Sequence, residues 1–348
     1  MKILIYGEYS GYGESLSKGF EELGYHAEVF SPNGDGFKEI ESSLKLKSKK
    51  AIFKLFELWC LIPRLSRFDK IIIMNPSFFS IFKGFGLLPL LFFVAMKKDL
   101  YLLCCGDDVE YIRAGDKELI AKYVYESVSY PKRKYFGRKL DFFVNYLCAK
   151  YSKFIIPVMY DYEVGWKSSK FREKVTKVIP LACYFDSEYI SKTTNYKEIN
   201  ILHGINRPQV KGSSVIIRAL NRISDEFDNV KVHLPERISQ KDYFKIFKDV
   251  DIAIDQCKCH GYGMNAIYSM MHGHIVLAPA DDLYNRSLDL SDNPVVSIEF
   301  DEEVIYSKLK MLLNRRDLDE IKQRTKKFAN DIHQSKKVSA MLLSYILK

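Results

Sequence analysis

Short apolar runs of β-favouring residues alternate with helical stretches along almost the whole chain of 348 residues. In the first half these runs predict strands at 2–6, 27–30, 70–74, 100–105, 153–158 and 177–181. In the second half they predict strands at 200–203, 229–234, 251–255, 274–278 and 294–300. Helices are predicted between most of them, for example at 14–23, 77–97, 211–226, 240–249, 263–272 and 301–314. Apolar strands separated by helices are typical of parallel sheets with helices on both faces, so we expect an α/β fold.

The number of predicted strands favours two sheets over one. A single sheet of eleven strands is uncommon, and the chain is too long for one compact core. We therefore expect two doubly wound, Rossmann-like domains, divided near 183–198, where the periodic pattern is lost before a new strand. Residues 1–185 would form the first domain, 199–330 the second, and 331–348 a terminal helix that packs back on the first.

The net charge is +9, from 53 Lys and Arg against 44 Asp and Glu. Residues 1–180 hold 29 basic and 21 acidic residues, whereas residues 181–348 hold 24 and 23, so the excess belongs to the first half. Such an excess suits acidic partners, but no RNA-reading motif is present, and we expect no nucleic acid. Seven cysteines without regular spacing, and no preceding secretory signal, predict reduced thiols in the cytoplasm.

The first candidate site is the glycine-rich loop that follows the first predicted strand and leads into a helix. Glycines there let backbone amides approach an anion, which makes Gly11, Tyr12 and Gly13 candidate ligand-binding residues. A tight strand-to-helix turn is the equal alternative. The loop lacks the G-x-G-x-x-G spacing, and no acidic residue ends the second strand, so a dinucleotide site is poorly supported.

The second candidate is the loop after the first strand of the second domain, with Gly204, Asn206, Arg207 and Lys211. Arg207 and Lys211 lie four residues apart at the start of a predicted helix, where cations are unfavourable unless an anion is bound. Two charges beside free backbone amides predict a diphosphate site. A solvated basic loop is the alternative.

The third candidate is the loop between a strand that ends at Asp255 and a helix that begins near Gly263. Its backbone amides predict contacts with a phosphate or a sugar hydroxyl. Two cysteines and one histidine within this loop do not make the four well-spaced ligands of a structural zinc site, so we expect no metal. The candidate ligand-binding residues are His260, Gly261, Tyr262, Gly263, Met264, Asn265 and Tyr268.

Residues 200–290 resemble the donor-binding domain of GT-B-fold glycosyltransferases, most closely the retaining family-4 enzymes of glycosyl transferases group 1. That family carries an Arg and a Lys-Gly before the first long helix of this domain, which Arg207 and Lys211-Gly212 match. It then carries E-G-F-G and a second Glu in an E-x7-E pattern. In the matching run, both glutamates are replaced, by His260 and Tyr268.

The resemblance implies two domains that face a cleft, and transfer of a sugar from a nucleotide-diphosphate donor to a glycan or lipid-linked acceptor. It also implies retention of configuration, a role in surface polysaccharide or glycolipid synthesis, and no metal or other cofactor. Arg207 and Lys211 would neutralise the charge that develops on the leaving diphosphate. In the family, the residues at the positions of His260 and Tyr268 contact the donor sugar and the ribose.

Two adjacent carboxylates, Asp107 and Asp108, follow the strand predicted at 100–105 and would lie at the carboxyl edge of the first sheet. One of them would orient or deprotonate an acceptor hydroxyl. Capping of the following helix is the equal alternative, because aspartate commonly has that role.

Two segments of the first half bear on a membrane surface. Residues 45–67 are basic and apolar with the single acid Glu57, a pattern typical both of an interfacial amphipathic helix on an anionic membrane and of a core-facing helix with a solvated basic edge. Residues 78–96 have nearly the length of a transmembrane span, but Lys83, two glycines and Pro89 favour a crossover helix. The run 131–139 adds a basic cluster.

Two other functions stay open. A nucleotide-sugar epimerase or phosphorylase of the same shape would use Asp107, Asp108 and His260 as acid and base groups. A non-catalytic binder of glycan or nucleotide would account for the two replaced glutamates.

Overall fold

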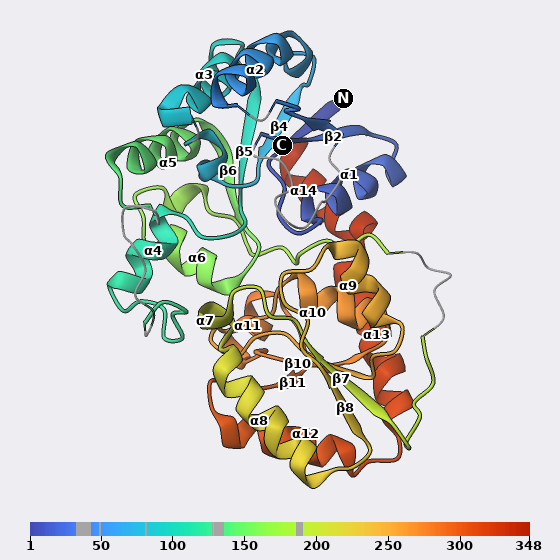
Figure 1. Cartoon of the computed structure of the whole chain (residues 1–348). Helices are drawn as coiled ribbons and strands as arrows, with labels where there is room; N and C mark the ends of the chain where they lie inside the picture. Colours follow the sequence, from blue (N-terminus) through green and yellow to red (C-terminus); the bar gives the residue numbers. More distant parts are fainter. Residues whose placement is uncertain (33–42, 49, 81, 127, 129–135, 186–190) are drawn as a thin grey trace. The chain divides into compact units, whose positions relative to one another are not determined.

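The computed structural model of the chain describes residues 1–32, 43–48, 50–80, 82–126, 128, 136–185 and 191–348. These residues divide into two compact units (Figure 1). Unit 1 comprises Met1–Ala121, Ser129–Tyr184 and Ser335–Lys348, and unit 2 comprises Lys122–Val128 and Phe185–Gln334. The sequence did not predict the transfer of Lys122–Val128 to the second unit. Residues 131–135 of the predicted basic run, and 186–190 of the predicted boundary, lie outside the described residues.

Unit 1 contains a six-stranded parallel sheet in the order β3-β2-β1-β4-β5-β6. Ile3, Leu4 and Ile5 of the central strand are completely buried, as expected for a sheet covered on both faces. The strands are β1 (Lys2–Tyr6), β2 (His26–Ser31), β3 (Leu44–Lys45), β4 (Lys70–Ile73), β5 (Asp99–Cys104) and β6 (Ser152–Pro157). Besides the C-terminal helix, the α-helices of unit 1 are α1 (Tyr12–Glu22), α2 (Ala51–Leu65), α3 (Leu88–Ala95), α4 (Val109–Asp116), α5 (Lys139–Tyr151) and α6 (Tyr160–Lys167). The 3-10 helices of unit 1 are η2 (Pro76–Phe79), η3 (Phe82–Leu87) and η4 (Arg172–Lys174).

Unit 2 contains a five-stranded parallel sheet in the order β11-β10-β9-β7-β8. Ile216 and Leu220 of α8 and Ile305 and Leu309 of α12 pack into its core. The strands are β7 (Ile199–His203), β8 (Val230–His233), β9 (Ile252–Ile254), β10 (Ile275–Ala278) and β11 (Val296–Ser297). The helices are α7 (Pro208–Lys211), α8 (Ser213–Glu226), α9 (Gln240–Phe247), α10 (Met264–Met271), α11 (Asp282–Ser287), α12 (Glu302–Leu313) and α13 (Leu318–His333).

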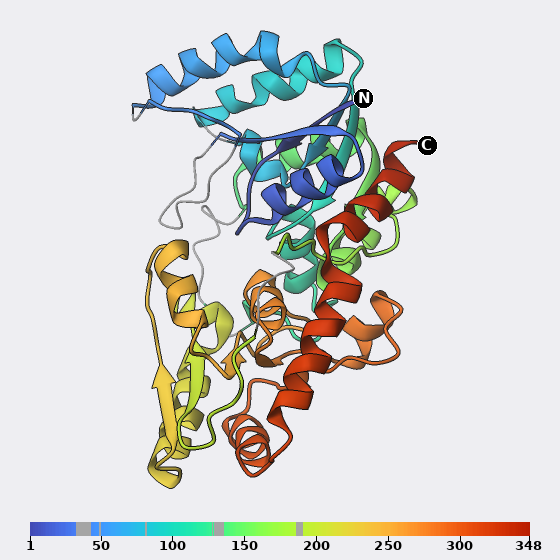
Figure 2. The same ribbon diagram turned by 90° about the vertical axis from the view of Figure 1, so that its right-hand side faces the viewer.

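The last helix, α14 (Ser335–Ile346), returns to unit 1 and packs on α1, as Figure 2 shows. Its Ser339 Oγ donates to the carbonyl of Leu16 at 3.1 Å, and Tyr101 OH donates to the carbonyl of Ile346 at 3.0 Å. A side chain at Gly19 would lie 2.3 Å from the Ser335 carbonyl oxygen, so the two helices approach each other through glycine. The predicted return of the C-terminal helix to the first domain is therefore confirmed.

The predicted α/β class with two parallel sheets is also confirmed, but two predicted elements are wrong. Residues 177–181 do not form a strand: Ile179 N–H bonds the Pro157 carbonyl, whereas Pro180 has no N–H to continue a ladder. The sixth strand of the sheet is β3, which was not predicted. The helix expected at 77–97 is divided into η2, η3 and α3. Gly84, within η3, has a left-handed φ of +106° that an α-helix does not allow, and Pro89 lies in the first turn of α3.

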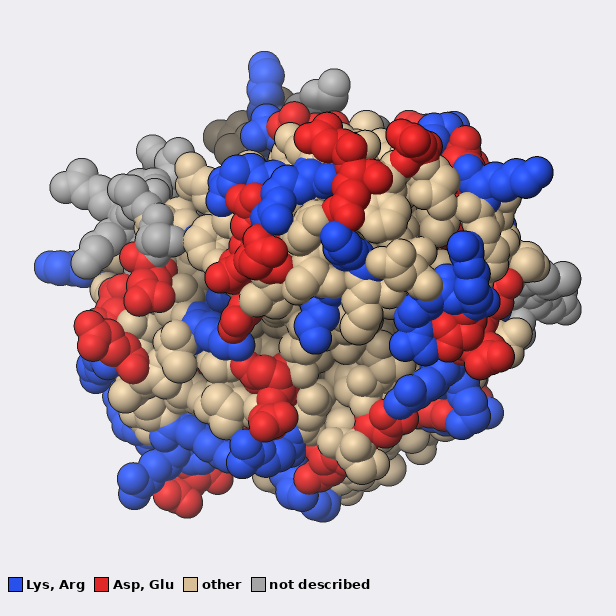
Figure 3. Space-filling view, turned by 90° about the horizontal axis from the view of Figure 1, so that it is seen from below, with Lys and Arg blue, Asp and Glu red and all other residues tan. Residues whose placement is uncertain are grey.

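Across the described part of the chain, we find no helix that combines the length and the apolar character needed to cross a bilayer. Charges of both signs alternate in small groups on the face in Figure 3, which looks at Figure 1 from below. Pairs between α8 and α12, such as Arg218 with Glu302 and Arg222 with Glu303, are of this kind. These pairs belong to the nearly balanced charge of the second half of the chain.

Candidate functional site

The strand order of unit 2 places two of the predicted loops next to each other. The chain proceeds from β7 to β8 on one side and then to β9 and β10 on the other side of β7. In open parallel sheets, ligands bind outside the carboxyl ends of the two strands at which this direction reverses. In unit 2 these strands are β7 and β9, which are followed by residues 204–212 and 255–263.

A buried ion pair joins these two loops. Lys211 Nζ lies 2.9 Å from Asp255 Oδ1, and the two side chains are only 9% and 3% exposed. Lys211 Nζ also donates to the carbonyl of Gly204 at 3.4 Å. Burial by itself would raise the pKa of Asp255, but the charge and the hydrogen bond of Lys211 outweigh burial and leave that pKa below its usual value. The positive charge of Lys211 is therefore balanced by the carboxylate of Asp255.

Asp255 also organises the beginning of α10. Its Oδ2 accepts from the Gly263 backbone N–H at 3.3 Å, and its Oδ1 accepts from Asn265 Nδ2 at 3.2 Å. The sequence assigned Gly263 and Asn265 to an external ligand, and the structure gathers both of them around an internal carboxylate. Gly204 completes the cluster, because a Cβ there would lie 2.5 Å from the hydroxyl of Tyr243.

His203 was not predicted as a site residue, although it ends β7. It is completely buried, and burial lowers its pKa to about 4. The neutral ring lies 3.0 Å from the Ile254 carbonyl through Nδ1 and 2.8 Å from Ser213 Oγ through Nε2. With Nδ1 protonated, it donates to the carbonyl and accepts from the serine, which ties the start of α8 to β9.

Arg207 is exposed at the start of α7, and its Nη2 donates to Tyr125 OH at 2.6 Å. Tyr125 belongs to the segment Lys122–Val128, which joins unit 2 from a distant part of the sequence. Lys122 of the same segment pairs with Asp281 at 3.0 Å. This segment is another part of the site that the sequence did not predict, because no local pattern connects residues 82 positions apart.

Three more of the residues predicted in unit 2 hold the third loop in place. His260 is 2% exposed, and its Nδ1 lies 2.7 Å from Asp281 Oδ2. Tyr262 is completely buried, with its hydroxyl 3.0 Å from His333 Nε2. A Cβ at Gly261 would lie 2.2 Å from the ring of Tyr284, so this position requires glycine. The structure thus gives these three residues internal contacts.

Three further predicted residues lie on or beside the same edge. Met264 is buried at the start of α10. Tyr268 is half-buried one turn further along the helix. Its ring packs edge-to-face on that of Phe244, with 5.2 Å between the ring centroids. Asn206 is half-buried between β7 and α7.

The sulfur atoms of the third loop point to backbone carbonyls. Cys257 Sγ lies 3.5 Å from the Lys211 carbonyl, and Cys259 Sγ lies 2.9 Å from the Gly261 carbonyl. Within the residues that the structure describes, no three His, Cys, Asp or Glu side chains group as metal ligands do.

The glycine-rich loop of unit 1 lies at the corresponding position of its own sheet, where the direction reverses between β1 and β4. Its backbone amides bind the side chain of Glu8: Gly11 N–H donates to Oε1 at 2.8 Å, and Glu14 N–H donates to Oε2 at 2.9 Å. A Cβ at Gly13 would lie 2.8 Å from Glu8 Oε2, and Tyr12 is completely buried. The predicted anion loop thus surrounds an acidic side chain of the chain itself, Glu8, which the sequence analysis missed.

The chemistry of Glu8 follows from its burial. The side chain is nearly buried, which raises its pKa to about 7 despite the hydrogen bonds from Glu14 and Gly11. Among the described residues, none of the groups that shift this pKa is a cation.

Of the two predicted acceptor-side aspartates, Asp108 has the capping role that was the alternative. It is completely buried, and its Oδ1 accepts from the Tyr111 N–H at 2.8 Å at the start of α4. Its Oδ2 accepts from Trp166 Nε1 at 2.7 Å. Burial raises its pKa to about 7, against the effect of these hydrogen bonds. Asp107 is half-buried, and its carbonyl accepts from Asn75 Nδ2 at 3.0 Å.

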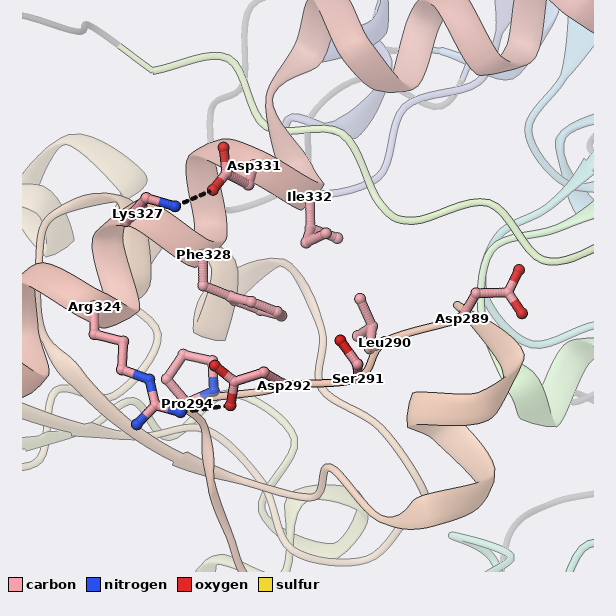
Figure 4. Close-up of a pocket in the computed structure, with 10 residues that line it drawn as sticks. All are labelled: Asp289, Leu290, Ser291, Asp292, Pro294, Arg324, Lys327, Phe328, Asp331 and Ile332. Carbon is pink, nitrogen blue, oxygen red and sulfur yellow. Dashed lines mark hydrogen bonds and ion pairs between the residues drawn. The ribbon is translucent and has the colours of Figure 1, made fainter.

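Figure 4 shows a hollow of about 290 Å³ in unit 2, beside α13. Four of the charged side chains that line it form two pairs, Arg324 with Asp292 and Lys327 with Asp331. None of the residues predicted for a ligand lines this hollow.

No protein-family model matches the chain, and no curated protein matches it. Solved structures do match over its full length. Sucrose-phosphate synthase from Thermosynechococcus elongatus is 10% identical, with 99% of this chain and 98% of that chain covered and a TM-score of 0.65. HepE from Anabaena in complex with UDP and glucose is 11% identical, with 99% of each chain covered and a TM-score of 0.62. MnaA from S. aureus with UDP is 14% identical, with 99% and 95% covered and a TM-score of 0.55.

These likenesses establish the fold. The chain has the GT-B architecture, with two Rossmann-like units and a C-terminal helix that returns to the first, as the sequence predicted. Identities this low carry no residue-by-residue correspondence, so the chemistry of the site depends on this chain's own side chains.

Proposed function

We propose that the protein is a glycosyltransferase that takes a sugar from a nucleotide-diphosphate donor and passes it to a glycan or lipid-linked acceptor. The observation that carries the proposal is the loop pair at the reversal of the unit 2 sheet, where Lys211 pairs with Asp255 and Arg207 lies exposed at the start of α7 in the same loop. The comparisons add support, because the HepE and MnaA structures of this fold were solved with UDP.

Arg207 and Lys211 have different parts in the proposed mechanism. The exposed guanidinium of Arg207 offers several fixed donors to a diphosphate, and Tyr125 restricts its orientation. Lys211 is shared with Asp255, so it contributes less net charge and holds the two loops together. As charge develops on the leaving diphosphate, both cations stabilise the transition state without a metal, with retention of configuration.

A nucleotide-sugar epimerase is the second candidate, favoured by one comparison. A UDP-N-acetylglucosamine 2-epimerase from Listeria monocytogenes, described as putative, has a TM-score of 0.51 and 10% identity. Such an enzyme would also bind a nucleotide-sugar. Unlike a transferase, it would pass no sugar to an acceptor and would release no nucleoside diphosphate as the product of such a transfer. In this structure Asp108 caps a helix and His260 is bonded to Asp281, so in either candidate these two side chains also have structural roles.

The first test is a thermal-shift screen of the chain with UDP, GDP, ADP and their sugars. We expect stabilisation by one nucleoside diphosphate and not by its nucleoside, because bound ligand stabilises in proportion to occupancy. Arg207→Ala should weaken diphosphate binding by tenfold or more, about the value of one charge-assisted hydrogen bond, and leave the nucleoside unaffected. Arg218→Ala, an exposed arginine of the same unit, is the matched control. Unchanged diphosphate affinity in Arg207→Ala would show that the diphosphate site is wrongly assigned.

A further inference from the structure

Helix α2 is apolar on two opposite faces. Its inner face contributes the buried side chains Leu58 and Leu65 to unit 1. Its outer face consists of Ile52, Phe53, Phe56 and Trp59, which are 72%, 56%, 70% and 55% exposed. The outer face of a surface helix normally carries polar residues, so this α2 face requires a reason.

The spacing shows that the exposed side chains form one continuous stripe. Counted from Ile52, the residues Phe56, Trp59 and Pro63 follow after four, seven and eleven positions. This spacing places all four side chains on one side of the helix. The short helix η3, which contacts α2, carries a further exposed aromatic side chain, Phe85, at 57%. Helix α2 lies at the outer edge of unit 1 in both ribbon views (Figures 1 and 2).

Basic side chains lie at both ends of the α2 face, and Glu28 of β2, which meets α2, is paired with Arg64 at 2.8 Å. Lys45, Lys47, Lys50 and Arg67 are all exposed at its two ends. Glu57 is the only acidic residue between positions 43 and 67, and its carboxylate accepts from Ser48 Oγ at 2.5 Å and from the Lys47 N–H at 2.7 Å. An apolar stripe with a cationic margin is complementary to a surface that is apolar inside and anionic outside.

We propose that the α2 face binds the surface of an anionic phospholipid bilayer, with the helix lying in the plane of the headgroups. Aromatic and aliphatic side chains enter the boundary of the acyl chains, while the lysines bind lipid phosphates. At 15 residues the helix is about 22 Å long, enough to lie on a bilayer and too short to span it. The proposal does not depend on the proposed sugar transfer.

The two tryptophans of the chain make the test direct. Trp59 lies on the α2 face, whereas Trp166 is completely buried and donates to Asp108, so only Trp59 can report on lipid. The full-length protein is mixed with vesicles of phosphatidylglycerol and phosphatidylcholine, or of phosphatidylcholine alone. We expect co-sedimentation with the anionic vesicles, a blue shift of Trp59 emission and quenching by brominated lipid, all weakened by high salt. The Trp59→Phe variant should still bind anionic vesicles but should show no lipid-dependent change in tryptophan emission.

Two variants separate the apolar and charged contributions. Ile52→Ser with Phe56→Ser should reduce vesicle binding at least tenfold, while Trp59 remains as the probe. Vesicle binding should fall about fivefold for each cation removed when Lys45→Gln, Lys47→Gln and Lys50→Gln are combined. Phe143→Ser, which alters an aromatic residue of α5 with 52% exposure, is the matched control and should change nothing. An unchanged melting temperature shows that each variant is folded.

Two results would overturn the proposal. One is wild-type protein that does not bind anionic vesicles, or that binds them equally well after the two serine substitutions. The other is a shift of Trp59 emission with protein concentration in the absence of lipid, together with a dimer in light scattering. That result would assign the α2 face to a second copy of the chain.

Discussion

The two units each bury one carboxylate at the reversal of their sheet, and these two carboxylates differ in their pKa. Glu8 in unit 1 and Asp255 in unit 2 both accept backbone N–H groups of a glycine-containing loop. Burial raises the pKa of Glu8 to about 7, whereas the pKa of Asp255 is lowered despite its burial. The difference is Lys211, which lies 2.9 Å from Asp255, while no cation acts on Glu8 among the described residues.

This comparison explains why an anionic ligand is expected at unit 2. In the unit 1 loop, the backbone N–H groups of Gly11 and Glu14 already donate to the Glu8 side chain, which adds negative charge when it ionises. In unit 2 the internal acid is neutralised by Lys211, and Arg207 stays exposed at the same loop. Both loops therefore surround a buried carboxylate. In unit 1 that carboxylate occupies the backbone amides, whereas in unit 2 it is paired with a lysine and the loop remains cationic.

The largest expected effect comes from removing the cation. Lys211→Met should destabilise the protein by about 3–5 kcal/mol, because Asp255 would be left charged and unpaired in a buried position. Urea unfolding at neutral pH measures this loss. The control is Lys197→Met, which removes an exposed lysine of unit 2 and should change stability by less than about 0.5 kcal/mol. Adding Asp255→Asn to Lys211→Met should restore part of the loss, and a double variant as unstable as the single one would contradict the pairing.

The next effect is a pH dependence with opposite signs in the two units. Because the pKa of Glu8 in the folded protein is about 7 and its ordinary value is 4.5, the folded state holds the proton more tightly. Its contribution to stability is complete below pH 4.5 and is lost as the pH rises through 7, by at most about 3 kcal/mol. The contribution of Asp255 is present above its ordinary value of 3.8 and is lost as the pH falls further.

Urea unfolding of the wild type and of Glu8→Gln between pH 5 and 8 isolates the Glu8 contribution. Asp108 also has a raised pKa and acts in the same direction, but it is present in both proteins and cancels in the difference. We expect the difference in unfolding free energy between the two proteins to change with pH. A constant difference across this range would mean that Glu8 titrates normally.

The smallest effect concerns the segment that unit 2 receives from the first half of the chain. Tyr125→Phe removes the acceptor of the Arg207 hydrogen bond and should cost about 1 kcal/mol or less, because Arg207 is exposed. We expect a larger relative change in diphosphate affinity than in stability, since the tyrosine restricts the guanidinium. Calorimetry with nucleoside diphosphates and thermal unfolding measure both quantities. Equal diphosphate affinity in wild type and Tyr125→Phe would show that Tyr125 has no positioning role.

Much of the architecture was predictable because it depends on local pattern. Continuous apolar runs such as Ile71 to Ile73 indicate buried parallel strands, and the glycine-rich loop at 11–13 indicates a turn between a strand and a helix. Where a strand has only two residues, as in β3, the pattern is too short to detect. At 177–181 the local pattern resembled a strand, but Pro180 cannot join a ladder.

By itself, the sequence determined the α/β class, the two sheets and the loops at which function was expected, because these follow from the order of apolar and glycine residues along the chain. Tertiary structure alone decided how the charges in those loops are used. Lys211 and Asp255 are 44 residues apart, and Arg207 and Tyr125 are 82 apart, so only the folded sheets bring them into contact. Burial then decided the ionisation of Glu8 and Asp108, since the pKa of a carboxylate depends on the solvent and partners that the fold leaves to it.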